Sequence, residues 1–178
     1  MAKCLLVIDM QNDFLNPKGY YAQKRNISPM IKIKDNLQTF LDKYFGKIPI
    51  VFIQAEYAPE QFGSNKFLCI KDSWGQEIVF DTQYANKIIK KNIHSSFSNP
   101  ELNEFLKNNN IDTILISGVT TENCVRETSL EGIDKGYKII IIKDCVGTNK
   151  ELEENQDEIF NQLRNKGAKI IFSKDLNL

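Results

Sequence analysis

The stretch 114–125, which reads I-L-I-S-G-V-T-T-E-N-C-V, places a cysteine where catalysis could occur. An apolar run ends at Gly118, a short polar turn follows, and Cys124 comes where a new helix is expected to begin. The free N–H groups and the positive dipole end of a helix favour an anion there, so the pattern indicates a thiol biased toward thiolate. A cysteine in the first turn of a helix is more often a small buried apolar residue. Other stretches of the chain must therefore decide whether Cys124 is a nucleophile.

Two charged residues end other apolar runs of the sequence. Asp9 ends the first expected strand, and Lys91 ends the third. Because the C-terminal ends of parallel strands lie on one edge of a sheet, we expect Asp9, Lys91 and Cys124 to converge there. An ammonium beside a thiol lowers the pKa of the thiol, and a carboxylate beside both can carry protons. The three residues predict a nucleophile, an activating cation and a general acid/base, although an aspartate after a strand can also simply cap a loop.

The elements that must position these residues alternate between strand and helix. Strands are expected at 3–9, 50–54, 87–91, 112–117, 137–142 and 168–172, and helices at 30–45, after a cap at Asn99, at 124–135, and after a capping box of Thr148 and Glu151. This alternation predicts an α/β fold: a single domain over 1–178 with a Rossmann-like, mostly parallel six-stranded sheet and helices on both faces, a three-layer α/β/α arrangement. Residues 55–82 show no clear period and are expected to form a lid or pocket wall.

Composition excludes several classes of function. The chain has 178 residues, and its 23 basic residues balance 23 acidic ones, which gives no global attraction to nucleic acid or an anionic membrane. No apolar run reaches transmembrane length, and the N-terminus lacks a signal-peptide pattern. The four cysteines are scattered without a C-x-x-C pair, which favours free thiols and a cytoplasmic location.

Three motifs together resemble the isochorismatase-like cysteine hydrolases. They are D-M-Q-N-D-F at 9–14, K-x-x-x-S-x-F at 91–97 and G-V-T-T-E-N-C-V at 118–125. This superfamily includes nicotinamidases, N-carbamoylsarcosine amidase, and ureidoacrylate and biuret hydrolases. Each motif alone is weak, but the three occur in the order and spacing of the family and cover almost the whole chain.

The resemblance implies a role for each matching residue. Cys124 would be the nucleophile, Asp9 the general acid/base and Lys91 the cation that stabilises the thiolate, with the neighbouring lysine at position 90 as a competitor for that role. The backbone N–H groups of Thr120 and Cys124 match the oxyanion hole of the family. The Val119–Thr120 peptide bond matches one that is cis in the family.

The resemblance also implies how the substrate is held and which cofactors are absent. Phe14 and Trp74 match aromatic positions that flank the substrate in relatives, and His94 could line the same pocket. Nicotinamidases carry a metal-binding D-x-H-x-x-H segment after the second strand, where this chain reads Q-A-E-Y-A-P-E-Q. Because His94 is the only histidine of the chain, we expect no catalytic metal and no cofactor, and nicotinamide and pyrazinamide become poor candidates as substrates.

The predicted function is cysteine-dependent hydrolysis of a C–N bond in a small amide, ureide or carbamoyl compound. One alternative is vinyl ether cleavage of the isochorismatase type, which does not need the thiol, and another is a non-catalytic interaction protein on the same fold. A nucleotide-binding module is disfavoured because no G-x-G-x-x-G follows the first strand. The expected partner is a small molecule rather than nucleic acid or a membrane, and the resemblance implies a homodimer or homotetramer.

Overall fold

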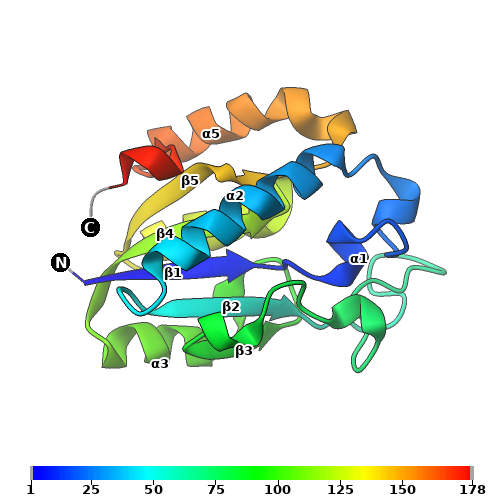
Figure 1. Cartoon of the computed structure of the whole chain (residues 1–178), viewed down its shortest axis with the longest axis horizontal. Helices are drawn as coiled ribbons and strands as arrows, with labels where there is room; N and C mark the ends of the chain where they lie inside the picture. The colour runs from blue at the N-terminus through cyan, green and yellow to red at the C-terminus, as the bar shows by residue number, and fades with distance from the viewer. Residues whose placement is uncertain (1, 177–178) are drawn as a thin grey trace.

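The computed structural model describes residues 2–176 and contains one six-stranded sheet (Figure 1). All neighbouring strands pair in parallel, so the mostly parallel sheet expected from the sequence is parallel throughout. The strand order is β3-β2-β1-β4-β5-β6, which reverses direction between β1 and β4. Ligands of doubly wound sheets bind beyond the strand ends at this kind of reversal. The strands are β1 (Ala2–Ile8), β2 (Ile50–Ala55), β3 (Lys87–Lys91), β4 (Ile111–Val119), β5 (Lys138–Gly147) and β6 (Lys169–Ile171).

Helices cover both faces of the sheet and give the predicted three layers. Successive residues of a strand point to opposite faces, so Leu5 and Val7 of β1 join one core cluster and Leu6 and Ile8 the other. The first cluster packs beneath α2 (Ser28–Tyr44), which crosses the sheet in Figure 1. The second packs beneath α3 (Pro100–Asn108), α4 (Arg126–Asp134) and α5 (Gln156–Asn165). Within residues 2–176 no helix combines the length and apolar character needed to cross a membrane.

Two helix starts differ from the sequence prediction. The turn after β4 is a π-helical segment, Thr121–Val125, which carries Cys124 and leads directly into α4. Strand β5 runs to Gly147, five residues beyond its expected end, so Thr148 is still buried against the sheet and does not cap a helix. Asn149 takes that role, with its side-chain oxygen accepting the N–H of Leu152 at 3.1 Å.

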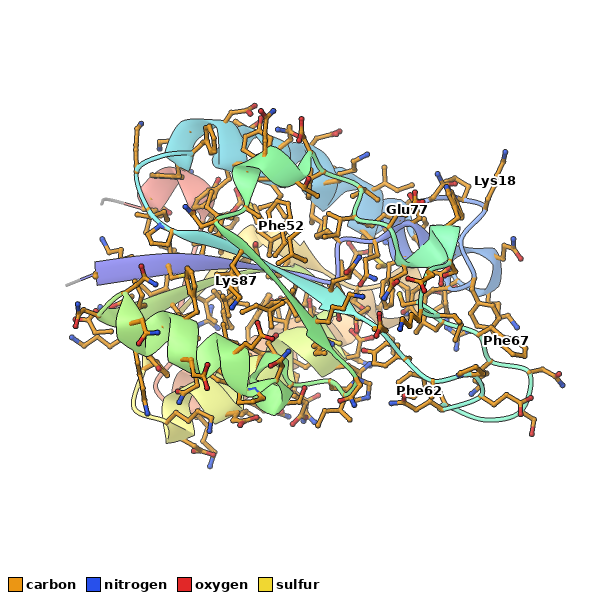
Figure 2. The ribbon with its side chains drawn as sticks, turned by 90° about the horizontal axis from the view of Figure 1, so that it is seen from below. Lys18, Phe52, Phe62, Phe67, Glu77 and Lys87 are labelled. Atoms are coloured by element: carbon orange, nitrogen blue, oxygen red, sulfur yellow. The ribbon has the colours of Figure 1, made fainter. Side chains whose placement is uncertain are left out.

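The segment 56–86 has little regular structure, as expected, and is held by buried polar side chains at α1 (Asn12–Leu15). The carboxylate of Asp13 accepts the backbone N–H of Cys69 at 2.6 Å and that of Tyr20 at 2.9 Å. Gly75 packs against this carboxylate so closely that a Cβ atom there would lie 2.3 Å from it. One buried charge therefore fixes two loops at the end of the molecule toward which β1 points, where Figure 2 labels Phe62, Phe67 and Lys18.

A glycine sets the distance between the two central strands. Gly118 of β4 has a φ of 111°, and a Cβ atom built there would lie 2.0 Å from the carbonyl oxygen of Ile8 in β1. The strands therefore approach most closely one residue before Asp9 and two before Thr120. Asp9 itself has a φ of 53°, a left-handed conformation that aspartate tolerates better than most residues.

Candidate active site

Asp9, Lys91 and Cys124 meet at the carboxyl edge of the sheet. Asp9 follows β1, Lys91 is the last residue of β3, and Cys124 lies in the π-helical turn after β4. The ammonium Nζ of Lys91 lies 2.9 Å from Oδ2 of Asp9 and 3.3 Å from Sγ of Cys124. Both charged side chains are fully buried. The competing Lys90 is half exposed and pairs with Glu56 at 2.6 Å, outside this cluster.

The electrostatics of the cluster favour an ion pair beside a neutral thiol. Burial lowers the pKa of Lys91, but the charge of Asp9 and the hydrogen bonds to Asp9 and Cys124 act in the opposite direction and leave this pKa raised, so the ammonium stays charged. Burial raises the pKa of the Cys124 thiol, the charge of Asp9 raises it further, and Lys91 only partly opposes them. The expected bias of Cys124 toward thiolate is therefore wrong for the resting protein, because exclusion of water outweighs the single neighbouring cation.

Tyr57 is a fourth member of the cluster that the sequence did not single out. Its hydroxyl accepts a hydrogen bond from Lys91 Nζ at 3.1 Å and lies 3.7 Å from Sγ of Cys124. Burial, followed by the charge of Asp9, raises the pKa of Tyr57, so its hydroxyl stays protonated. Its position in the sequence could have indicated this, because Tyr57 comes two residues after β2 ends. The C-terminal end of β2 lies on the same edge of the sheet as those of β1 and β3.

A cavity of about 240 Å³ opens onto Cys124 and has mainly aromatic walls. His94 contributes its ring, with Nδ1 3.8 Å from Sγ and the ring stacked on Phe62 at 5.6 Å between centroids. Burial, and then the charge of Lys91, lowers the pKa of His94, so the ring is neutral at pH 7. The lining residues are Phe14, Tyr21, Tyr57, Phe62, Leu68, His94, Thr120, Asn123 and Cys124.

Trp74 does not line this cavity, which corrects the expectation from the resemblance. Its side chain is 45% exposed, and its backbone oxygen accepts a hydrogen bond from Asn12 at 3.0 Å. The close packing of Gly75 on Asp13 turns the backbone of this segment toward α1 and leaves the indole outside.

The backbone beside Cys124 has the expected geometry around Thr120. The Val119–Thr120 peptide bond is cis. The carbonyl oxygen of Thr120 accepts the N–H groups of Asn123 and Val125, at 3.2 and 3.1 Å, which closes the turn. Both residues expected to supply oxyanion N–H groups, Thr120 and Cys124, border the cavity.

Side chains that commonly bind metal ions do not form a cluster in the part of the chain that the structure describes. Residues 2–176 contain no group of three or more His, Cys, Asp or Glu side chains placed to hold a metal ion. In the segment after β2, the carboxylate of Glu56 is already taken, since it accepts a hydrogen bond from Gln76 at 2.8 Å and pairs with Lys90.

This chain is similar to known proteins in both sequence and structure. The isochorismatase domain model matches residues 3–175. An isochorismatase-like hydrolase from Alkaliphilus metalliredigens superposes with a TM-score of 0.82 at 27% identity, over 97% of this chain and 93% of that one. A zinc complex of pyrazinamidase from Pyrococcus horikoshii gives 0.83 at 26% identity, over 97% and 99% of the two chains. Nicotinamidase 3 from Arabidopsis thaliana is 28% identical over 84% of this chain and 76% of its own length.

These relatives are named as hydrolases, and two of them as amidases, which supports hydrolase activity for this chain. The match to the domain model spans nearly every residue that the structure describes. The chain belongs to the isochorismatase family.

Proposed function

We propose that this protein hydrolyses the C–N bond of a small amide, ureide or carbamoyl compound through a covalent intermediate on Cys124. The observation that carries the proposal is the buried contact of three groups: a thiol 3.3 Å from an ammonium that is itself 2.9 Å from a carboxylate. A nucleophile, a stabilising cation and a proton carrier in mutual contact are the parts that covalent acyl transfer needs.

Formation of the intermediate begins with the thiol in its protonated state. As Sγ attacks the carbonyl carbon, the thiol proton passes to Asp9, and Lys91 stabilises the negative charge that develops on sulfur. The carbonyl oxygen becomes an oxyanion that the N–H groups of Thr120 and Cys124 would bind. Asp9 is fully buried beside this exchange, and its interaction with the Cys124 thiol contributes to the raised pKa of that thiol.

The intermediate then breaks down in two steps. When the tetrahedral species collapses, the C–N bond breaks and Asp9 gives its proton to the departing nitrogen, releasing ammonia or an amine and leaving a thioester or thiocarbamate. Asp9 next takes a proton from water, the hydroxide adds to the carbonyl carbon, and the C–S bond breaks. The proton held by Asp9 returns to sulfur, which restores the starting state.

The proposed reaction uses no metal. The pyrazinamidase that shares the fold was crystallised in complex with zinc, but within residues 2–176 no three His, Cys, Asp or Glu side chains are grouped to hold a metal ion. His94 is the single histidine, and it stacks on Phe62 beside the thiol. We therefore expect activity to survive dialysis against a chelator, and nicotinamide to be a poor substrate.

The test is ammonia release from a panel of ureides, carbamoyl amino acids and simple amides. We expect Cys124→Ala to lower kcat by roughly 10³-fold or more, the loss typical when a covalent nucleophile is removed. Cys145→Ala is the matched control, since it removes a buried thiol from β5. Intact-mass spectrometry should show a substrate adduct on the wild type and none on Cys124→Ala. Full activity in Cys124→Ala would refute the proposal.

A further inference from the structure

A second cavity adjoins the one above Cys124 and has a different chemistry. Its volume is about 330 Å³, and it shares Tyr21, Phe62 and Leu68 with the inner cavity. The two spaces therefore meet at an aromatic and apolar partition rather than lying on separate faces. We call this second space the outer cavity.

Positive charge gathers in the outer cavity without acidic partners. Lys24, Arg25 and Lys66 line it, and no aspartate or glutamate does. The chain as a whole has 23 basic and 23 acidic residues, so this excess is local. Among the ion pairs of residues 2–176, none involves these three side chains.

The nearest acids are engaged by the backbone. Glu60 accepts the N–H of Asn65 at 2.9 Å, and Glu151 accepts that of Asn26 at 3.2 Å. Hydrogen bonds from the backbone N–H groups of Glu151 and Asn26 lower the pKa of Glu151, and the charge of Arg25 adds a smaller effect, although the two side chains form no ion pair. Lys24 Nζ lies 4.4 Å from the centroid of the Tyr20 ring, and Arg25 donates a hydrogen bond to the carbonyl oxygen of Lys24 at 3.0 Å, so neither positive charge is neutralised by a carboxylate.

We propose that the outer cavity is a subsite for a carboxylate, and that the substrate is an amide or carbamoyl compound carrying that carboxylate on a short apolar spacer. This inference rests on the proposed function, since it takes the inner cavity to hold the scissile bond beside Cys124. The partition of Tyr21, Phe62 and Leu68 would contact the spacer, and Lys24, Arg25 and Lys66 would bind the anion. Arginine binds carboxylate in a two-pronged geometry, and lysine adds a point charge.

The test uses the reactivity of Cys124, which requires no turnover. N-iodoacetyl-β-alanine carries a carboxylate, and its methyl ester is the neutral match. Both alkylate thiols, so rates at Cys124 can be followed by mass spectrometry at about pH 8.5, where the carboxylate is ionised. Dividing each rate by that of the same reagent with a small free thiol removes intrinsic reactivity and gives an anion-to-ester ratio.

We expect an anion-to-ester ratio of roughly ten in the wild type at low ionic strength. The ratio should fall toward one in the triple variant Lys24→Gln/Arg25→Gln/Lys66→Gln. It should also fall toward one in the wild type at high ionic strength, because salt screens exposed charges. The matched control removes the same charge at exposed lysines outside both cavities, Lys32→Gln/Lys47→Gln/Lys107→Gln, and should keep the wild-type ratio. A wild-type ratio near one, or an equal fall in the control, would overturn the carboxylate subsite.

Failure of the proposed function gives a different result. If no amide releases ammonia while the ratio behaves as expected, the subsite stands and the reaction assigned to Cys124 is wrong. If Cys124 reacts with neither reagent, calorimetric titration of glutaramate and its methyl ester into the same variants decides the question. Preference for the anion that disappears in the cavity variant supports the subsite, and equal binding or no binding overturns it.

Discussion

Replacing Lys91 by methionine should show how much unfolding free energy is lost when the buried ion pair is broken. The Lys91 ammonium and the Asp9 carboxylate lie 2.9 Å apart, and both side chains are fully buried. Removing one partner leaves the other charge without water or a counter-ion, which costs about 3–5 kcal/mol of unfolding free energy. A domain of this kind has roughly 5–15 kcal/mol in total, so Lys91→Met should fold but be markedly less stable.

Urea denaturation at pH 7 measures this loss, and two variants isolate its cause. Lys90→Met removes the neighbouring, half-exposed pair with Glu56 and should cost about 1 kcal/mol or less. Asp9→Asn/Lys91→Met leaves no unpaired charge, so its loss should be smaller than the sum of the two single losses by roughly 2 kcal/mol. Equal losses in Lys91→Met and Lys90→Met would refute this account of the cluster.

Four further predictions concern the buried cluster and the two loops held by Asp13. Tyr57→Phe removes the hydroxyl beside the thiol and should lower kcat about tenfold. It should also cost roughly 1–3 kcal/mol of stability, because the buried Lys91 ammonium loses a hydrogen-bond acceptor. Tyr137→Phe, which loses a partly buried hydroxyl elsewhere, should match the wild type in steady-state assays. In Asp9→Asn, hydrolysis should fall by roughly 10²-fold or more, because the proposed proton carrier is lost. Iodoacetamide should label Cys124 faster in this variant, because the charge of Asp9 raises the pKa of the thiol in the wild type. In the wild type that raised pKa keeps the thiol protonated at neutral pH, so labelling should climb as the pH increases; fast labelling below pH 7 would contradict it. Asp13→Ala leaves the backbone N–H groups of Cys69, which is buried, and Tyr20, which is partly buried, without their acceptor, at up to roughly 1–3 kcal/mol each, and limited trypsin digestion should cut the two loops first.

The sequence was informative where strands end. Asp9, Lys91 and Cys124 could be brought together on paper because each follows an apolar run, and parallel strands open on one edge. The structure places them in contact as that argument requires. Their protonation state could not be predicted in the same way, since it depends on how completely water is excluded, and the sequence carries no measure of that.

The walls of the cavity were beyond prediction for a different reason. Tyr57 and Phe62 lie in a segment without periodicity, whose path is set by hydrogen bonds that its backbone donates to distant side chains such as Asp13. Trp74 illustrates the same limit, because an aromatic residue in that segment was expected in the pocket and points outward. Side chain to backbone contacts across dozens of residues leave no local pattern to find.

The close approach at Gly118 has a consequence for directed evolution of this enzyme. A library aimed at new substrates can vary the cavity walls supplied by residues 56–86, because these walls are separate from β1 and β4, the strands that Asp9 and Cys124 follow. Position 118 admits no second amino acid without pushing β4 away from β1, and with them Thr120 away from Asp9. Gly118 does not line the cavity, yet it sets the spacing between Thr120 and Asp9. Variants selected for altered specificity should therefore keep this glycine.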